Sequence, residues 1–238
     1  MTQSQKPPPA VPVQDTPELR NAIIGCGLHL RDKLGYFISS WGNISVRVEK
    51  GMLVTPSRVE YHQIAPEDLV LLSWEGKRLA GTRVPTSECE MHRQLMLERP
   101  DVGVWIHHHG PWSSVLAGAG KPLPVVADDM AELVGGEVRC APHIVAGKHR
   151  ELALAAREAI GPDAWAVLLA NHGVVCGGRT IDEAVACCQI VEKSAMMFLF
   201  GTLLGGTRTI EESLWREERE RYLFRYGKPE DLKGVLQE

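Results

Sequence analysis

Short apolar segments that end in turns recur along this 238-residue chain, and helical segments stand between them at irregular intervals. Residues 44–48 and 52–54 flank a charged turn that ends in glycine, which predicts a β-hairpin. Further strands are expected at residues 70–74, 102–107, 125–127 and 164–170. Because strands and helices do not alternate regularly, the pattern predicts a layered α/β fold with a largely antiparallel sheet.

Helix starts are indicated by capping residues. Thr16 before Pro17 predicts a first helix that runs to about Gly35. Two capping boxes predict a helix that ends near residue 99 and a long helix over about 184–204; these boxes are Ser87 with Glu90 and Thr180 with Glu183. Further helices are expected at about 148–160 and 209–226.

The length and mixed hydrophobicity of the chain predict a single domain over residues 15–238. Residues 1–14 are rich in Pro and Gln and lack the apolar stretch of a signal peptide. We therefore expect a disordered N-terminal segment and a cytoplasmic protein. The formal net charge of -4 gives no basic surplus, so nucleic acid is not an expected partner.

The longest apolar stretch, residues 184–204, is interrupted by Glu192 and Lys193, which would be costly at the centre of a bilayer. We therefore expect a core helix and no membrane association. The six cysteines show no CxxC spacing and are expected to be reduced, small buried residues.

Three histidines follow apolar strand segments. His107 and His109 lie at the end of one predicted strand, where the two-residue period places both side chains on one face and His108 on the other. His172 follows a second strand and precedes Gly173. Three neutral imidazoles suit zinc, or alternatively Mn²⁺, Co²⁺ or Fe²⁺, and leave a coordination position for a substrate oxygen.

An isolated HxH pattern more often has no metal-binding role, and the apolar and aromatic residues on both sides of it argue against a tag. The other histidines are expected to be structural or solvated; they are His29, His62, His92, His143 and His149. Glu88 follows Thr86-Ser87 at a helix start, where a carboxylate is favoured. It is either a simple helix-start charge or a fourth ligand that acts as a base when substrate arrives.

Three clusters of small hydrogen-bond donors are candidates for an anion site. They are Ser40-Trp41-Gly42-Asn43, Thr55-Pro56-Ser57-Arg58 and Thr86-Ser87. Backbone amides, hydroxyls and the Asn43 carboxamide could together enclose a phosphate, with Arg58 adding positive charge. Each cluster alone is more often an ordinary turn.

Five motifs in order resemble the class II aldolase/adducin family. They are Gly-Asn-Ile-Ser at 42–45, Thr-Pro-Ser at 55–57, Thr-Ser-Glu at 86–88, His-x-His at 107–109 and Asn-His-Gly at 171–173. The resemblance extends over nearly the whole chain after residue 15. It implies a three-layer α/β/α sandwich around a largely antiparallel sheet, assembled as a homotetramer with active sites at subunit interfaces.

The resemblance also implies roles for individual residues. Zinc would be held by His107, His109 and His172, with Glu88 near the metal as a ligand and acid/base. The family's phosphate-binding positions match Gly42, Asn43, Ser57, Thr86 and Ser87, and Ser40 belongs to the same cluster. Tyr226 resembles a C-terminal tyrosine that reaches a neighbouring active site in these enzymes.

Two positions depart from the family pattern. Arg58 stands where the family usually has glycine, so the anion could be a carboxylate instead of a phosphate. Asp128, or Asp129, stands where fuculose phosphate aldolase supplies a tyrosine acid. An aspartate is a poor acid at neutral pH but a workable base for the hydroxyl proton that starts cleavage.

The expected function is zinc-dependent aldol cleavage of a small ketose phosphate, such as a fuculose-, deoxyribulose- or methylthioribulose-type 1-phosphate, to dihydroxyacetone phosphate and an aldehyde. The alternatives are a sugar-phosphate 4-epimerase and a decarboxylase or non-haem metal oxygenase of the same family, acting on a hydroxy-keto acid. A non-enzymatic interaction module should lack the complete ligand set that is present here.

Overall fold

An eight-stranded sheet forms the centre of the molecule in the computed structural model, which describes residues 7–232. Its strand order is β4-β3-β2-β1-β5-β8-β7-β6, and every neighbouring pair is antiparallel except β6 and β7. The strands are β1 (Asn43–Val48), β2 (Gly51–Val54), β3 (Val70–Leu72), β4 (Arg78–Ala80), β5 (Val104–His108), β6 (Cys140–Ala141), β7 (Ala166–Leu169) and β8 (Gly173–Gly178).

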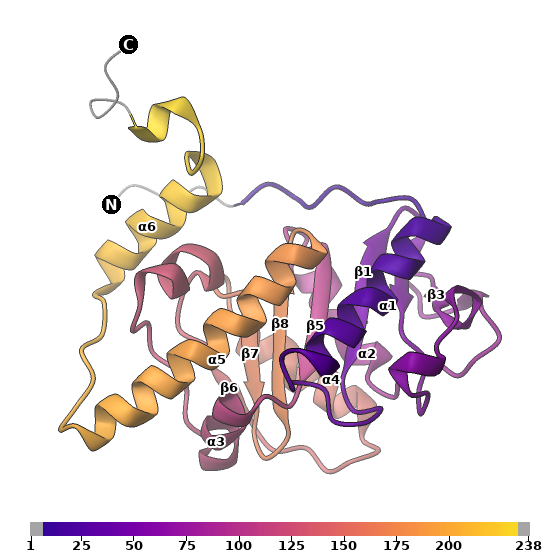
Figure 1. The fold of residues 1–238 in the computed structure, drawn as a ribbon, viewed down its shortest axis with the longest axis horizontal. Coiled ribbons are helices and arrows are strands. Elements are labelled where there is room, and N and C mark those ends of the chain that lie inside the picture. Colours follow the sequence, from indigo (N-terminus) through magenta and orange to yellow (C-terminus); the bar gives the residue numbers. More distant parts are fainter. Residues whose placement is uncertain (1–6, 233–238) are drawn as a thin grey trace.

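Helices cover both faces of this sheet (Figure 1). One face carries α1 (Pro17–Asp32), α3 (Pro111–Ala119) and α5 (Ile181–Leu203), and the other carries α2 (Cys89–Glu98) and α4 (His149–Ile160). The predicted three-layer α/β/α sandwich with a largely antiparallel sheet is therefore confirmed.

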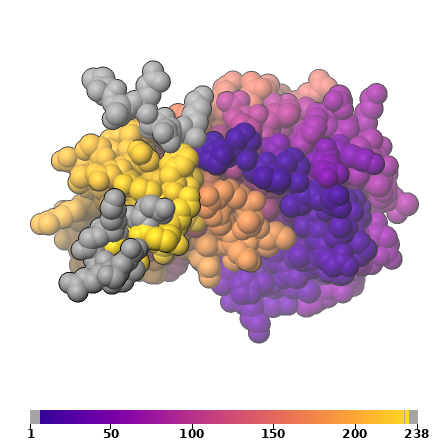
Figure 2. All heavy atoms as spheres, turned by 90° about the horizontal axis from the view of Figure 1, so that it is seen from above, coloured from indigo at the N-terminus to yellow at the C-terminus, as the bar shows by residue number. Residues whose placement is uncertain are grey.

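The last helix, α6 (Glu212–Phe224), lies outside the three layers and packs against a π-helical turn, η3 (Met130–Val134). In Figure 2 this C-terminal part forms one end of the molecule, and α1 lies toward the other end. The remaining elements are three short 3-10 helices, η1 (Tyr61–Gln63), η2 (Pro66–Asp68) and η4 (Pro229–Leu232).

Hydroxyl caps start the first and the longest helix. The Thr16 hydroxyl accepts a hydrogen bond from the Leu19 amide at the start of α1, and Thr180 caps α5 by accepting from Glu183. The predicted box at Thr180 is only half formed, because the Glu183 carboxylate accepts from the Arg179 amide. Helix α1 ends at Asp32, a few residues before the predicted Gly35.

Two local predictions are wrong. Helix α2 begins at Cys89 with Glu88 as its N-cap, so Ser87 and Glu90 form no capping box; the Glu90 carboxylate pairs with Arg93 instead. Residues 125–127 form no strand. The Val125 carbonyl accepts from the Ile210 amide of the segment before α6, and the edge of the sheet is formed by β6.

The sequence patterns did not indicate β8. Its glycines give a weak strand signal, yet tight packing requires them. A Cβ at Gly177 would lie 2.7 Å from the Trp105 ring, and one at Gly178 would lie 2.3 Å from the Ala184 amide nitrogen. Helix α3 was also not predicted.

Residues 7–14 are extended and bonded to the domain. The Ala10 amide donates to the Pro100 carbonyl, and Val13 forms a parallel bridge with Val48 at the end of β1. This arrangement differs from the disorder predicted for residues 1–14; residues 1–6 lie outside the described part of the chain.

Within residues 7–232, helix α5 alone is long and apolar enough to cross a membrane. It packs on β8 and α3 through a buried face that includes Cys187, Cys188 and Val191. Glu192 lies on that same buried face with its carboxylate bonded to the start of α3. These contacts agree with the predicted core helix.

Candidate metal centre

The three histidines of the sequence motifs lie together at one end of β5 and β8. The ligand nitrogens of His107, His109 and His172 all lie within 4.8 Å of one another. His107 ends up beside His109 because they are two residues apart at the end of β5, and His172 enters from the tight turn between β7 and β8. This turn contains Asn171 at a φ of 57°, in the left-handed region that asparagine tolerates better than most residues.

Hydrogen bonds orient the His107 ring toward the centre of this cluster. Its Nδ1 lies 3.0 Å from the carbonyl oxygen of Val174, so Nδ1 carries the proton and Nε2 is left with its lone pair. The Nε2 atoms of His107 and His109 are 3.0 Å apart. Two nitrogens bound to one tetrahedral zinc lie ~3.3 Å apart, so this pair fits a small divalent ion.

Glu88 joins the cluster from the N-cap position of α2. Its carboxylate oxygens lie 3.1 Å from Nε2 of His172 and 3.4 Å from Nε2 of His107. The Asn43 side-chain amide donates to the second oxygen at 2.7 Å. Burial acts to raise the pKa of Glu88, but the neighbouring imidazoles and the Asn43 hydrogen bond outweigh it and lower the pKa, so the side chain is ionised.

The imidazoles of His107 and His109 are uncharged at neutral pH. Burial lowers the pKa of His107 to about 4 and the pKa of His109 to about 3. A divalent ion binds the neutral form of imidazole, because the protonated ring has no free lone pair. The donor set consists of three imidazole nitrogens beside one carboxylate, which fits zinc or a similar divalent metal.

His108 points away from this cluster, as the strand period predicts. It is fully buried, stacks on Tyr36, and forms a second compact group with Cys176 and Cys188. This second group is a poor metal site. The Gly110 amide donates to Nδ1 of His108, so the proton of the neutral ring resides on Nε2, the nitrogen that faces Cys176.

His92 is a further buried residue at the site, although the sequence predicts only a structural or solvated role for it. It lies on α2 and is fully buried. Its Nε2 lies 2.5 Å from Oδ1 of Asn43, and its Nδ1 lies 2.7 Å from the hydroxyl of Ser45. The sequence signal that could have found it is the spacing of four residues from Glu88 on one helix, which places both residues on the same face.

The three donor clusters are neighbours in space. The Ile44 amide donates to the Thr55 hydroxyl, and the Thr86 amide donates to the Thr55 carbonyl. A bridge between Pro56 and Pro85 continues this contact. The structure therefore brings three loops together: those of Gly42 and Asn43, of Ser57 and Arg58, and of Thr86 and Ser87. The third loop leads directly to Glu88.

Not every polar group in these loops is free to bind an anion. The Thr55 hydroxyl accepts from Ile44, and the Thr86 hydroxyl accepts from the Glu88 amide. Ser87 and Arg58 are exposed, and Ser40 and Ser57 are half-buried. Arg58 has a φ of 57°, a left-handed conformation that is costly for an arginine.

Asp128 and Tyr226 do not join the histidine cluster of their own chain. Asp128 is exposed at the start of the segment that leads into η3, and its charge acts on Glu218 of α6. Asp129 pairs with Lys193 of α5. Tyr226 is 55% exposed after α6, and its ring lies tilted against the ring of Tyr222.

Trp41 and Trp112 differ in their surroundings. Trp41 is 65% exposed and meets the His109 ring edge-on, so it lines the approach to the cluster. Trp112 packs against Phe200 of α5. The Trp112 amide donates to the carboxylate of Glu192, and this buried carboxylate also accepts from Ser113. Glu192 thereby fixes the start of α3 directly after His109, a role that the sequence did not indicate.

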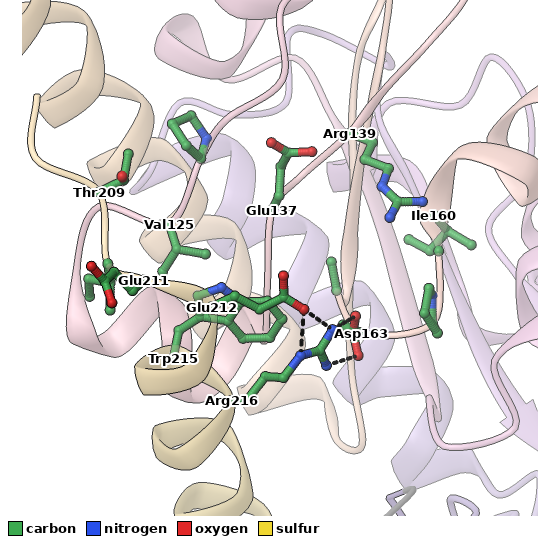
Figure 3. A pocket seen from close by; sticks show the side chains of 15 residues that line it. Val125, Glu137, Arg139, Ile160, Asp163, Thr209, Glu211, Glu212, Trp215 and Arg216 are labelled. Carbon is green, nitrogen blue, oxygen red and sulfur yellow. Dashed lines mark hydrogen bonds and ion pairs between the residues drawn. The ribbon is translucent and has the colours of Figure 1, made fainter. Parts of the chain in front are cut away.

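A separate cavity of about 440 Å³ lies at the start of α6 (Figure 3). Its walls include Glu137, Arg139, Asp163 and Trp215. Arg216 crosses it and pairs with Asp163 and with Glu212. None of its lining residues belongs to the histidine cluster, and its charges of both signs are already paired in part, so we do not assign the chemistry to it.

Known proteins are similar to most of this chain. Residues 21–199 match the family described as Class II Aldolase and Adducin N-terminal domain. A 5-methylthioribulose-1-phosphate/5-deoxyribulose-1-phosphate aldolase from Rhodospirillum rubrum is 35% identical over 185 residues, covering 76% of this chain and 80% of the relative. A 5-deoxy-D-ribulose 1-phosphate aldolase from Bacillus thuringiensis is 36% identical over 173 residues, covering 72% and 80%.

Solved structures show the same relationship. An L-fuculose 1-phosphate aldolase superposes with a TM-score of 0.82 at 29% sequence identity, over 88% of this chain and 98% of that chain. The family match spans all eight strands of the central sheet and the segments that carry the three histidines and Glu88. The chain therefore belongs to the class II aldolase and adducin family.

Proposed function

We propose that the protein is a cytoplasmic, zinc-dependent aldolase that cleaves a small ketose 1-phosphate to dihydroxyacetone phosphate and an aldehyde. The observation that carries this proposal is the convergence of three imidazoles and one ionised carboxylate beside a set of donor-rich loops. The relatives named for 5-deoxyribulose and 5-methylthioribulose phosphates favour substrates with an apolar end.

His107, His109 and His172 would hold the metal, with Glu88 as a fourth ligand that can leave. Zinc, or Mn²⁺, Co²⁺ or Fe²⁺ in its place, supplies Lewis-acid stabilisation of negative charge on the substrate oxygens. The carbon–carbon bond breaks when the adjacent hydroxyl loses its proton. The electron pair of that bond remains on the ketone fragment, and the other fragment leaves as an aldehyde.

Glu88 is the group we assign to the final proton transfer. Once substrate displaces it, its carboxylate would take up a proton from water, and the carboxyl would return this proton to the carbanion of the ketone fragment, while the base releases the hydroxyl proton to water. Its position supports this role, because one oxygen is held by Asn43 while the other faces His172 and the open side of the cluster. Trp41 would cover the apolar end of the substrate.

The phosphate would bind between the three loops. Gly42, Ser57, Thr86 and Ser87 would contribute amides and hydroxyls, with Ser40 at the edge and Arg58 adding charge. Asn43 is the exception, because both ends of its carboxamide already have partners: Glu88 and His92. Its part in phosphate binding is therefore limited to the remaining N–H and to its backbone.

The base that removes the hydroxyl proton would be Asp128 or Tyr226, reaching the site from a neighbouring subunit of a homotetramer, because neither lies in the histidine cluster of its own chain. Tyr226 is exposed and lies outside its own histidine cluster, which favours a role between subunits. We expect one domain at residues 15–238, and several copies of it would associate in the homotetramer. Exposed apolar residues on α3 and at the end of α5 support this association; they include Val115, Phe200, Leu203 and Leu204.

The test combines metal analysis with a substrate screen. The purified protein should contain a stoichiometric divalent metal, and 5-deoxyribulose, 5-methylthioribulose and fuculose 1-phosphates should be screened for release of dihydroxyacetone phosphate. We expect release from at least one of them and loss of release on chelation. Carbon dioxide release from a hydroxy-keto acid, with no dihydroxyacetone phosphate from any ketose, would overturn the proposal.

A further inference from the structure

We propose that Ser45, His92 and Asn43 form a buried hydrogen-bonded relay that positions the Glu88 carboxylate. This inference rests on the proposed function, since it assigns positioning residues to the aldolase site. The relay begins inside the core at Ser45 and ends at the carboxylate beside the three histidines.

The Glu88 carboxylate at the end of the relay fixes the direction of every hydrogen bond in it. The Glu88 carboxylate only accepts, so the side chain of Asn43 must present its NH₂ group to it. The amide oxygen of Asn43 then faces His92 and must accept from Nε2–H. A neutral His92 with its proton on Nε2 accepts at Nδ1, so the Ser45 hydroxyl donates there.

Each donor therefore points toward the negative charge. Such aligned hydrogen bonds strengthen one another in a medium of low polarity. Ser45 and His92 are fully buried and Asn43 is nearly so. Burial also lowers the pKa of His92 to about 4, which keeps the ring neutral at physiological pH.

The fold fixes the spacing of these groups. Asn43 and Ser45 are two residues apart on β1 and so share one face of the sheet. Glu88 and His92 are four residues apart, with the His92 amide bonded to the Glu88 carbonyl, and so share one face of α2. Asn43 also pairs in register with His107 across β1 and β5, which places the relay next to the metal cluster.

The relay predicts a specific effect on turnover. It holds the carboxylate oxygen that faces Asn43 and leaves the oxygen that faces His172 to accept and return protons. Loss of the relay should lower kcat, because Glu88 then samples other orientations, with little change in KM. Loss of such supporting hydrogen bonds at metal sites typically reduces activity or metal affinity about 10- to 100-fold.

Three variants separate this role from a purely structural one. His92→Leu removes both hydrogen bonds, His92→Gln can keep the donor to Asn43, and Ser45→Ala removes only the first donor. We expect the fall in kcat to be largest for His92→Leu and small for His92→Gln. Ser194→Ala is the matched control, because Ser194 is fully buried and its hydroxyl has no partner within the described residues.

A second measurement is independent of turnover. Each variant is loaded with Co²⁺, and its visible absorption spectrum and cobalt affinity are recorded beside far-ultraviolet circular dichroism. We expect altered cobalt spectra in Ser45→Ala and His92→Leu at unchanged helix content, and the wild-type spectrum in Ser194→Ala. If His92→Leu does not fold, the kcat and the cobalt spectrum of Ser45→Ala test the relay instead.

Wild-type kcat and cobalt spectra in both Ser45→Ala and His92→Leu would overturn the relay, as would equal losses in Ser194→Ala. If the wild-type protein cleaves no ketose phosphate, the proposed function fails, but the cobalt spectra still decide the relay.

Discussion

Gly173 lies against His109: a Cβ built on this glycine would be 2.7 Å from Cδ2 of the imidazole and 2.5 Å from the carbonyl oxygen of His108. The second contact is with backbone, which cannot rotate away. Glycine is therefore required here by the close approach of the β7–β8 turn to the end of β5, and this approach brings His172 to the other two histidines.

Gly173→Ala should displace the histidines and weaken metal binding. We expect a loss of stability of about 1–3 kcal/mol, as for overpacking of a tight core, and a metal affinity at least ~10-fold lower, as for disturbed support of a metal ligand. Competition with a chelator measures the affinity. Gly118→Ala in α3 is the control, because its added Cβ would meet no atom within 4 Å; a stability loss there as large as at Gly173 would contradict the packing argument.

His172→Gln should remove stoichiometric metal and abolish cleavage, while the fold is kept. The side chain comes from a surface turn and is partly exposed, so little packing is lost. Metal analysis after dialysis is the measurement. His149→Gln, which changes an exposed histidine at the start of α4, should retain metal; equal metal content in the two variants would exclude His172 as a ligand.

Arg58→Gly should change stability and substrate affinity in opposite directions. Glycine relieves the left-handed backbone conformation at this position, and we expect stabilisation of up to about 1 kcal/mol. If Arg58 contacts the anion, KM for the phosphorylated substrate should rise and its dependence on salt should weaken. Arg58→Lys keeps the charge and should keep the salt dependence, so an unchanged KM in Arg58→Gly would remove Arg58 from the anion site.

Asp101→Asn should destabilise the protein by about 3 kcal/mol, because Arg99 would remain buried without a counter-charge. The two side chains are nearly inaccessible and form a double hydrogen bond. Urea unfolding at neutral pH measures this loss. Glu151→Gln removes the partner of an exposed pair with Lys148 and should cost less than about 1 kcal/mol.

The same pair has a predictable pH dependence. Burial acts to raise the pKa of Asp101, but the hydrogen bonds and charge of Arg99 and the indole of Trp165 outweigh it, so the pKa is lowered. A lowered pKa in the folded state adds stability at pH values above the unfolded pKa of about 4. The advantage of wild type over Asp101→Asn should therefore shrink as the pH falls below about 4; a constant difference would contradict this assignment.

The sequence predicts features that depend on the regular spacing of side chains along a strand or helix. His107 and His109 share a face because they are two residues apart in a strand, and the layered antiparallel fold followed from hairpins that do not alternate regularly with helices. The roles of these residues as ligands stay predictions until metal is measured.

Other features depend on contacts between distant segments. The link from Ser45 to Glu88 exists only because β1 lies against α2, and neither segment alone indicates it. The sequence does not predict strand β8, because Gly177 and Gly178 are poor strand residues. Glycine is needed at both positions, since Trp105 and α5 leave no room for a side chain. Asp128 was placed by family resemblance, and the π-helical turn that follows it directs it toward α6.

The position of His172 after β7 sets the order in which the site can arise during synthesis. A chain still attached to the ribosome carries Glu88, His107 and His109 before the hairpin of β7 and β8 emerges. Because β8 follows His172 in the chain and joins β5 to β7, the three imidazoles can converge only when the middle of the sheet is completed, so metal binding would require the carboxyl-terminal third of the chain.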